Sequence, residues 1–320
     1  MKATGRGLGI YRKDEEIVPY NKNSTVNRFS DITGETVMTS YGVFPGIELI
    51  YNDVHAQSCR AERADSGNII KINHCREGRV ECEFQGEFCY LSEGDLLIAR
   101  NLDAGGGSYF PLSHYHGITI KIDVDKAPKC FSCFLDDVNV SPAALACKFC
   151  SDGKCFVSRG EPYAEHIFSE LYYVPKSIQK GYFKVKILEL LLFLSAMDVK
   201  KDQSKAHCIP KAHVCLAKRV NRYLSEHMEE RITLDQLSAL FHVSGTQIKN
   251  SFKAVYGVSV YAFIRTQKMQ GAALLLRHTD RTILDIAGSY GYDNGSKFAK
   301  AFKDTMGVAP KEYRCSAANH

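Results

Sequence analysis

The chain has 320 residues, of which 45% are hydrophobic and 24% are charged, and these proportions are ordinary for a folded protein. This length exceeds one ordinary domain and suits two, each with its own core. The strongest apolar run, from Ile187 to Leu194, is much shorter than the ~20 residues of a membrane span. The start, "MKATGRGLGIYRKDEE", has no apolar signal segment, so we expect a cytoplasmic protein that contacts no membrane.

Charge is distributed unevenly along the chain. Residues 205–320 contain 17 Lys and Arg against 9 Asp and Glu, whereas residues 1–204 contain 24 against 27. A basic segment joined to a near-neutral one is typical of a nucleic-acid-binding module. Charge alone also allows a chance cluster of lysines on a solvated surface.

Residues 1–40 are polar and rich in Gly, Asn, Ser and Thr, so we predict an arm before the first domain. Residues 41–204 have a different character. Short runs with alternating or β-branched residues, such as "GIELIYNDVHA", "NIIKINHC" and "HGITIKID", recur between turn signals. Evenly spaced short strands of this kind predict a sandwich or a small β-barrel.

Two helices are expected near the end of this domain, in "YAEHIFSELYYV" and "GYFKVKILELLLFLSAMD". The second helix is apolar on more than one face, which requires burial on two sides. It either caps the barrel alone or also meets a second copy of the chain, which makes it the candidate homodimer interface. A polar linker, "VKKDQSKAHCIP", leads to the last domain, placed at residues 205–320.

The last domain is predicted to be entirely helical. Four residues with good N-cap side chains stand before periodic segments. They are Thr233, Ser244, Thr282 and Asn294. Gly257 and Gly307 mark helix ends, because glycine readily takes the left-handed conformation there.

An internal repeat occupies this helical domain. "TLDQLSALFHVS" (233–244) matches "TILDIAGSYGYD" (282–293) at an offset of 49, and the segments after the turn match at an offset of 50. Each copy consists of a short helix, a tight turn and a longer helix that ends in glycine, which is the helix-turn-helix plan. Small residues at Ser238 and Ala287 allow the two helices of a copy to approach closely. Two copies in a basic domain favour DNA binding over an ordinary helical hairpin.

Two stretches carry a resemblance to a known family. "ILDIAGSYGYDNGSKFAKAFKDTMGVAPKEYR" and "FKAVYGVSVYAFIRTQKMQGAALLL" resemble the DNA-binding domain of AraC/XylS transcription regulators, over roughly a third of the chain. The resemblance implies an all-α domain with two helix-turn-helix units joined by a linker helix. It implies a sequence-specific regulator that binds double-stranded DNA, is not an enzyme and needs no cofactor. RNA polymerase is a further candidate partner, and activation and repression both stay open.

Helix geometry separates buried from outward residues on the two recognition helices. Ile248, Phe252 and Val255 in the first, and Phe298, Ala301, Phe302 and Met306 in the second, are expected to be core. The resemblance places base-reading positions on Thr246, Lys249, Asn250, Ser296 and Lys300. Phosphate or structural roles are expected for Lys253, Arg265, Lys268, Lys303 and Arg314. Lys297 is a DNA-binding candidate of undecided role.

The strand-rich domain resembles the cupin-like sensor domains of the same family, chiefly in "YLSEGDLLIARN". The resemblance implies a barrel that binds a small-molecule effector and supports dimerisation. Candidate effector residues are His74, His114 and His116, with His55, Arg76 and Tyr109 as further polar residues within reach. For each histidine, an ordinary core or surface role is the alternative.

An enzyme is the less favoured class. Some cupins hold a metal through a His-x-His pair, a nearby glutamate and another histidine, and "HYHG" contains such a pair at His114 and His116. No acid occupies residues 117–121, and the nearest upstream histidine, His74, is isolated. We therefore assign neither a metal nor catalysis to this domain from sequence.

Cysteines suggest a third form of control. The chain has twelve, and "CFSCFLDDVNVSPAALACKFCSDGKC" contains two Cys-x-x-Cys pairs followed by one more cysteine. These are Cys130, Cys133, Cys147, Cys150 and Cys155. Paired thiolates at this spacing can close a tetrahedral zinc site, although the spacer is slightly short. Structural zinc, a thiol or metal sensor, control by a protein partner and plain free cysteines all stay open.

Overall fold

A computed structural model of the chain divides it into two compact units, residues 1–208 and residues 209–320. It describes residues 16–21, 24–31, 33–59, 67–84, 87–100, 108–129, 131, 140–151, 155–199 and 208–317. The division falls four residues after the end of the predicted sensor domain. Within the described residues, no helix is long and apolar enough to cross a membrane.

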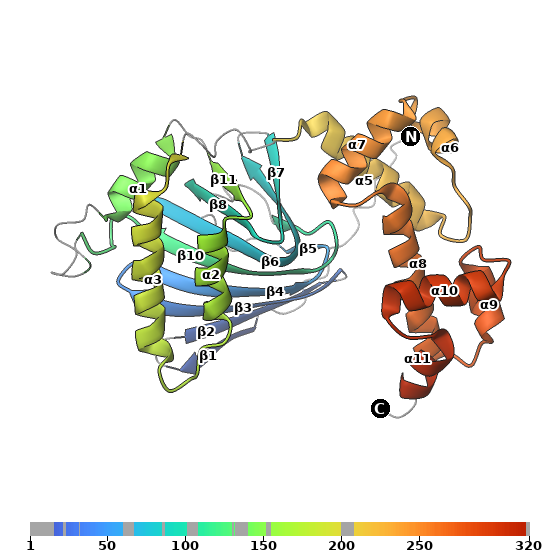
Figure 1. Cartoon of the computed structure of the whole chain (residues 1–320), viewed down its shortest axis with the longest axis horizontal. Coiled ribbons are helices and arrows are strands. Elements are labelled where there is room, and N and C mark those ends of the chain that lie inside the picture. The colour runs from blue at the N-terminus through green and yellow to red at the C-terminus, as the bar shows by residue number, and fades with distance from the viewer. Residues whose placement is uncertain are drawn as a thin grey trace, which may run out of the picture. The chain divides into compact units, whose positions relative to one another are not determined.

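The first unit is built on one antiparallel sheet (Figure 1). Its main path runs β1-β2-β3-β4-β10-β6-β8-β11. The bounds of these strands are Glu16–Asn21, Ser24–Asp31, Gly34–Phe44, Ile47–His55, Tyr115–Asp123, Ile69–Phe84, Asp95–Arg100 and Phe156–Arg159. Three further strands, β5 (Ser58–Cys59), β7 (Glu87–Ser92) and β9 (Ser108–Tyr109), pair beside this path. Strands therefore alternate with turns much as the sequence predicts, and β1 and β11 form the ends of the described path.

Three helices cover one face of this sheet. They are α1 (Pro142–Phe149), α2 (Pro162–Leu171) and α3 (Gln179–Ala196), and Figure 1 shows α2 and α3 lying across the strands. Alternate residues of the central strands, such as Ile70, Ile72, Ile118 and Ile120, are almost fully buried against these helices. The Tyr51 hydroxyl also donates a hydrogen bond of 2.6 Å to the carbonyl oxygen of Leu171 at the end of α2.

The opposite face of the sheet carries a second apolar cluster. Its buried members include Val54, Cys75, Leu97, Tyr115 and Val157. Because side chains alternate between faces along a strand, residues next to one another in sequence contribute to different clusters. The sheet thus has two distinct faces: the helix-bearing face and the opposite face.

The predicted arm at residues 1–40 is wrong from Glu16 onward. Residues 16–21 and 24–31 form β1 and β2, and β3 begins at Gly34. Along β2 and β3 the register pairs Val26 with Thr39 and Arg28 with Val37. The polar Asn, Ser and Thr residues that suggested an arm are tolerated because many of these side chains are only partly buried. The remaining residues, 1–15, lie outside the described part of the chain.

The second unit is helical throughout its regular elements. Its helices are α5 (Lys211–Glu226), α6 (Leu234–Phe241), α7 (Gly245–Tyr256), α8 (Val260–His278), α9 (Ile283–Ser289), α10 (Gly295–Met306) and α11 (Pro310–Ala317). The long helix α8 lies between two similar helix pairs, α6 with α7 and α9 with α10 (Figure 1). Each pair corresponds to one copy of the sequence repeat.

All four predicted N-caps are confirmed. The side chains of Thr233, Ser244, Thr282 and Asn294 accept hydrogen bonds from backbone amides in the first turns of α6, α7, α9 and α10. Thr233 also forms a full capping box with Gln236. The two predicted terminal glycines, Gly257 and Gly307, cap α7 and α10 with φ angles of 77° and 81°. Local sequence signals therefore set the helix boundaries here.

Candidate nucleic-acid interface

The two helix pairs share one turn geometry. His242, after α6, has a φ of 55°, and Gly291, after α9, has a φ of 75°. These residues occupy equivalent positions of the repeat. A Cβ atom on Gly291 would lie 2.6 Å from the carbonyl oxygen of Glu229, so this turn requires glycine both for its backbone angle and for space.

Close helix contact within each pair follows from small side chains. A Cβ atom on Gly245, at the start of α7, would meet the Ser238 hydroxyl oxygen of α6 at 3.4 Å. In the second pair, Ala287 is fully buried. The predicted role of Ser238 and Ala287 in close packing agrees with these contacts. Each longer helix is thereby held firmly against the shorter one.

The inward faces of α7 and α10 are the predicted ones. Ile248, Phe252 and Val255 are fully buried on α7, and Phe298 and Phe302 are fully buried on α10. Ala301 is also buried, and Met306 packs against the same core while staying partly exposed. The opposite faces of both helices are consequently left to solvent.

The outward faces carry the predicted DNA-contacting residues. Thr246, Lys249, Asn250 and Lys253 on α7, and Ser296, Lys297, Lys300 and Lys303 on α10, are all exposed. Arg265 is exposed on α8. Among the residues that the structure describes, none of the five lysines has an acidic side chain within ion-pair distance. Their charges are thus available to an anionic partner.

Two other basic residues have structural contacts. The ammonium group of Lys268, which is 9% exposed, donates hydrogen bonds to the carbonyl oxygens of Glu230 (3.1 Å) and Tyr290 (3.0 Å). Burial lowers the pKa of Lys268. Arg314 donates to the carbonyl oxygens of Leu276 (3.3 Å) and Arg281 (2.6 Å). Of the phosphate and structural roles that the sequence left open, these contacts favour the structural one for both.

Arg265 and Lys297 line the same cleft of about 470 Å³ in the helical unit. Leu224 of α5, Lys268 of α8 and the turn before α10 also contribute to its wall. Arg265 follows the first copy of the repeat and Lys297 belongs to the second. The structure thus brings together two exposed basic residues that sequence spacing alone could not connect.

Comparison with known proteins identifies this unit. Residues 237–316 match a family model described as a helix-turn-helix domain. The transcriptional regulator Rob of Salmonella typhimurium is 35% identical over 95 residues, which are 30% of this chain and 33% of Rob. An uncharacterized HTH-type transcriptional regulator of Staphylococcus aureus (strain COL) is 34% identical over 272 residues, 85% of this chain and 30% of that protein. The C-terminal unit is an AraC-type helix-turn-helix domain.

A solved structure is also similar to this chain. It is a probable AraC family transcriptional regulator from Rhodopseudomonas palustris, 30% identical, with a TM-score of 0.30 over 32% of this chain and 97% of that one. The chain spans about a third of the length of the curated relatives named above. The AraC-type domain is therefore assigned from the sequence matches, and the activity of the whole protein is a separate question.

The candidate effector histidines lie on the helix-bearing face of the sheet, not on the opposite one. His74, 1% exposed, is 2.9 Å from the Glu165 carboxylate of α2, and its ring stacks on Phe168. His116 of β10 pairs with Asp53 of the neighbouring strand β4 and lies on the same face of the sheet as Tyr51. His114 adjoins His116, with ring centroids 4.5 Å apart. Strand alternation therefore turns His74 and His116 towards the face that α1, α2 and α3 cover.

Sequence reasoning missed a polar group on the opposite face. The Asn52 side-chain amide donates to the Thr119 hydroxyl oxygen (2.9 Å), and the Thr119 hydroxyl donates to the side-chain amide oxygen Oδ1 of Asn73 (2.7 Å). These residues come from β4, β10 and β6, which are neighbours in the sheet. The alternation of each strand gave a signal that they share a face, but only the strand order shows that they meet.

The cysteines are arranged differently from the predicted zinc cluster. Cys130 and Cys133 lie outside the described residues, Cys147 is exposed on α1, and Cys150 is buried at the end of that helix. Cys155 instead contacts Cys89 of β7, which in turn contacts Cys208. Cys89 shares a hydrogen bond with Cys155, and its Sγ lies 3.2 Å from the Sγ of Cys208. The hydrogen bond with Cys89 lowers the pKa of Cys155 to about 7.

Proposed function

We propose that the chain is a sequence-specific DNA-binding transcription regulator and not an enzyme. The observation that carries this proposal is the pair of firmly held helices, α7 and α10, which turn unpaired lysines and small polar side chains outward. Lysines supply phosphate contacts and steer association, whereas Asn, Thr and Lys near the start of a helix can read base edges in the major groove. The two helix pairs then act as two helix-turn-helix units on one DNA duplex, joined by α8.

In both copies, base reading and phosphate binding are proposed to involve different residues. Thr246, Lys249 and Asn250, and Ser296 and Lys300, lie in the first half of their helices and are assigned to base edges. Lys253 and Lys303, one turn further along, are assigned to phosphates, and Arg265 and Lys297 to the cleft beside α10. Gly295 offers no side chain at the start of α10, so the second unit has fewer groups with which to read bases.

Selection of binding sites from a pool of random duplexes tests the proposal. We expect Lys300→Ala to weaken binding to the selected duplex by tenfold or more, because one good base contact contributes about 1–3 kcal/mol. Binding to an unrelated duplex should change little. Lys303→Ala should weaken both alike and reduce the salt dependence by about 0.9 in slope.

The matched control is Lys311→Ala, which removes an exposed lysine of α11 that is not assigned to DNA. It should bind both duplexes as the parent chain does. Equal losses on both duplexes for Lys300→Ala would make Lys300 a phosphate contact. If the parent chain enriches no sequence from the random pool, the proposal of a sequence-specific regulator is rejected.

The first unit is proposed to be a cupin-like sensor whose sheet closes around a small molecule. The polar group formed by Asn52, Asn73 and Thr119 supports a ligand on the face opposite the helices, since it offers amide and hydroxyl groups beside an apolar cluster. Thermal denaturation of the full chain with a library of metabolites tests this. A specific effector must raise the melting temperature, and Thr119→Val should reduce that rise.

Helix α3 is proposed as the homodimer interface. Its buried side packs on the sheet, yet Val185 and Leu192 are 61% and 41% exposed. They are seven positions apart and therefore lie on one face of the helix. Light scattering of the full chain should show a dimer, and the Val185→Asp, Leu192→Asp double variant should be monomeric. A monomeric parent chain at high concentration would leave α3 as a cap of the sheet only.

A further inference from the structure

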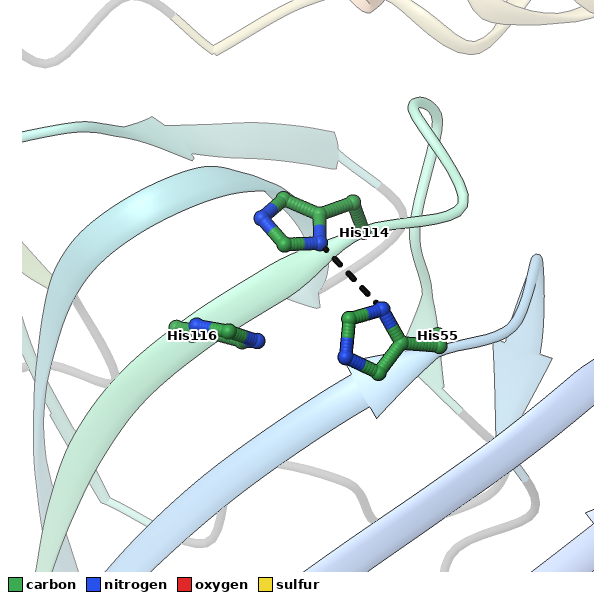
Figure 2. A group of neighbouring side chains, drawn as sticks. All are labelled: His55, His114 and His116. Atoms are coloured by element: carbon green, nitrogen blue, oxygen red, sulfur yellow. Dashed lines mark hydrogen bonds between the residues drawn. The ribbon is translucent and has the colours of Figure 1, made fainter. Parts of the chain in front are cut away.

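Three histidines converge at one edge of the helix-bearing face (Figure 2). His55 ends β4, His116 lies on β10, and His114 directly precedes that strand. One ring nitrogen from each lies within 4.8 Å of the other two. The side chain of His55 is 59% exposed, and those of His114 and His116 are 31% and 30% exposed. The cluster is therefore open to solvent on the side of His55.

Two carboxylates hold the histidines in place. The Asp53 carboxylate lies 3.0 Å from Nε2 of His55, and the Glu77 carboxylate lies 3.2 Å from Nε2 of His114. In the tautomer that carries its hydrogen on Nε2, the nitrogen that faces a carboxylate in both rings, Nδ1 keeps its lone pair. A carboxylate behind a histidine in this way is the usual arrangement around a protein-bound metal, because it fixes the ring and raises its basicity.

The two Nδ1 atoms then face each other across 3.5 Å (Figure 2). They share a hydrogen bond when one of them carries a hydrogen, and a cation can take the place of that hydrogen when both hydrogens are on Nε2. A metal with nitrogen ligands at about 2.0–2.1 Å in tetrahedral geometry separates neighbouring nitrogens by about 3.4 Å. The observed separation of 3.5 Å fits that spacing.

His116 supplies the third nitrogen. Its Nε2 is buried and has no hydrogen-bond partner, although an Asp53 oxygen lies 2.8 Å away in a direction unsuited to a hydrogen bond. A buried ring nitrogen without such a bond is costly unless another ligand uses it.

The backbone explains why these side chains meet. His116 faces Asp53 on β4 and Glu77 on β6, and the pairing with β6 shifts between His116 and Gly117. Such a bulge redirects a side chain. A Cβ atom on Gly78 would lie 2.1 Å from the carbonyl oxygen of His114, so glycine at this position lets the two strands approach closely. The site is thus built into the sheet.

We propose that His55, His114 and His116 bind one divalent first-row transition-metal ion, with Asp53 and Glu77 orienting His55 and His114 and a solvent oxygen as the fourth ligand. Imidazole nitrogens suit Zn²⁺, Co²⁺, Ni²⁺ and Cu²⁺ and disfavour Mg²⁺ or Ca²⁺, which take oxygen ligands. The ion would link β4 to β10. This site is independent of the proposed DNA binding, and it differs from the cysteine cluster weighed as a zinc site from sequence.

Titration of the metal-free, reduced full chain with Co²⁺ tests the site, followed by visible absorption. One equivalent should produce the d–d bands of a tetrahedral nitrogen and oxygen site, without the near-ultraviolet charge-transfer band of thiolate ligands. His55→Gln and His116→Gln should weaken Co²⁺ binding at least tenfold. Glu77→Gln, which alters only the orienting carboxylate, should weaken it about 10- to 100-fold.

His166→Gln is the matched control, because His166 is an exposed histidine of α2 that also pairs with a carboxylate. It should bind Co²⁺ as the parent chain does. His55 is the most exposed of the three ligands, so His55→Gln should fold normally, and Co²⁺ should raise the melting temperature of the parent chain but not of this variant.

Two results would overturn the proposal. The first is a parent chain that binds no stoichiometric Co²⁺. The second is a thiolate charge-transfer band that persists with unchanged affinity in His55→Gln and His116→Gln, which would assign the metal to the cysteines.

Discussion

The ammonium nitrogen of Lys268 lies 3.0 Å from the carbonyl oxygen of Tyr290. This hydrogen bond joins α8 to the turn between α9 and α10, and a second one reaches the carbonyl oxygen of Glu230. A buried lysine thus fixes the orientation of the second helix pair relative to α8. In the proposed DNA binding, Lys268 would therefore act through structure and not through direct contact.

Lys268→Met should destabilise the helical unit by about 1–3 kcal/mol, because two buried carbonyl oxygens would lose their donor. Hydrogen exchange of α8 and α10 measures this unit separately from the sheet. Arg265→Met on the same helix is the control, since Arg265 is exposed and should affect DNA affinity without changing exchange. Equal exchange in Lys268→Met and the parent chain would contradict the structural role.

Two glycines of the AraC-type domain should respond to alanine in opposite directions. Gly307 has a φ of 81° with open space around its Cβ position, so Gly307→Ala should cost about 1 kcal/mol through backbone strain alone. Gly288 lies within α9, has open space and has no positive φ. Gly288→Ala should therefore stabilise the unit by about 0.5–1 kcal/mol. Urea denaturation checks both, and a shift of the same sign in the two variants would contradict the assignment.

The helical unit could be predicted from sequence because its signals are local. Thr233 and Asn294 cap their helices through backbone amides within three residues of them. The spacing of Phe298 and Phe302 identifies the buried face of α10. Because the sequence repeats, each of these local signals occurs twice. Outward residues such as Lys300 followed once the inward face was known.

The sheet unit was less predictable because its contacts join distant residues. His55 and His114 are 59 positions apart and meet only because β4 and β10 are neighbours in the sheet. The partnership of Cys89 with Cys155 depends on the fold in the same way. The prediction of an arm was wrong for residues 16–40 for a related reason. Their strands are specified by pairing with β4 and with each other, not by their own composition.

His74 should make the first unit sensitive to mild acid. Burial lowers the pKa of His74, and the nearby Glu165 opposes this effect only in part. As pH falls below the ordinary histidine value of about 6.5, the unfolded chain binds a proton that the folded unit does not, so stability falls. His74→Gln does not titrate and can still donate to Glu165, so it should lose less stability between pH 7 and pH 5. Urea denaturation at the two pH values decides, and equal losses would exclude His74 as the cause.

Cys155 should be more reactive than Cys150 at neutral pH. The hydrogen bond with Cys89 stabilises its thiolate and lowers its pKa to about 7, whereas burial raises the pKa of Cys150 to about 11. Because the thiolate is the nucleophile, iodoacetamide labelling of Cys155 should reach half its maximal rate near pH 7, while Cys150 stays unlabelled. Cys89→Ala removes the hydrogen bond, so the midpoint for Cys155 should rise towards the ordinary value of about 8.5. Peptide mass spectrometry follows both sites, and an unchanged midpoint in Cys89→Ala would show that Cys89 does not activate Cys155.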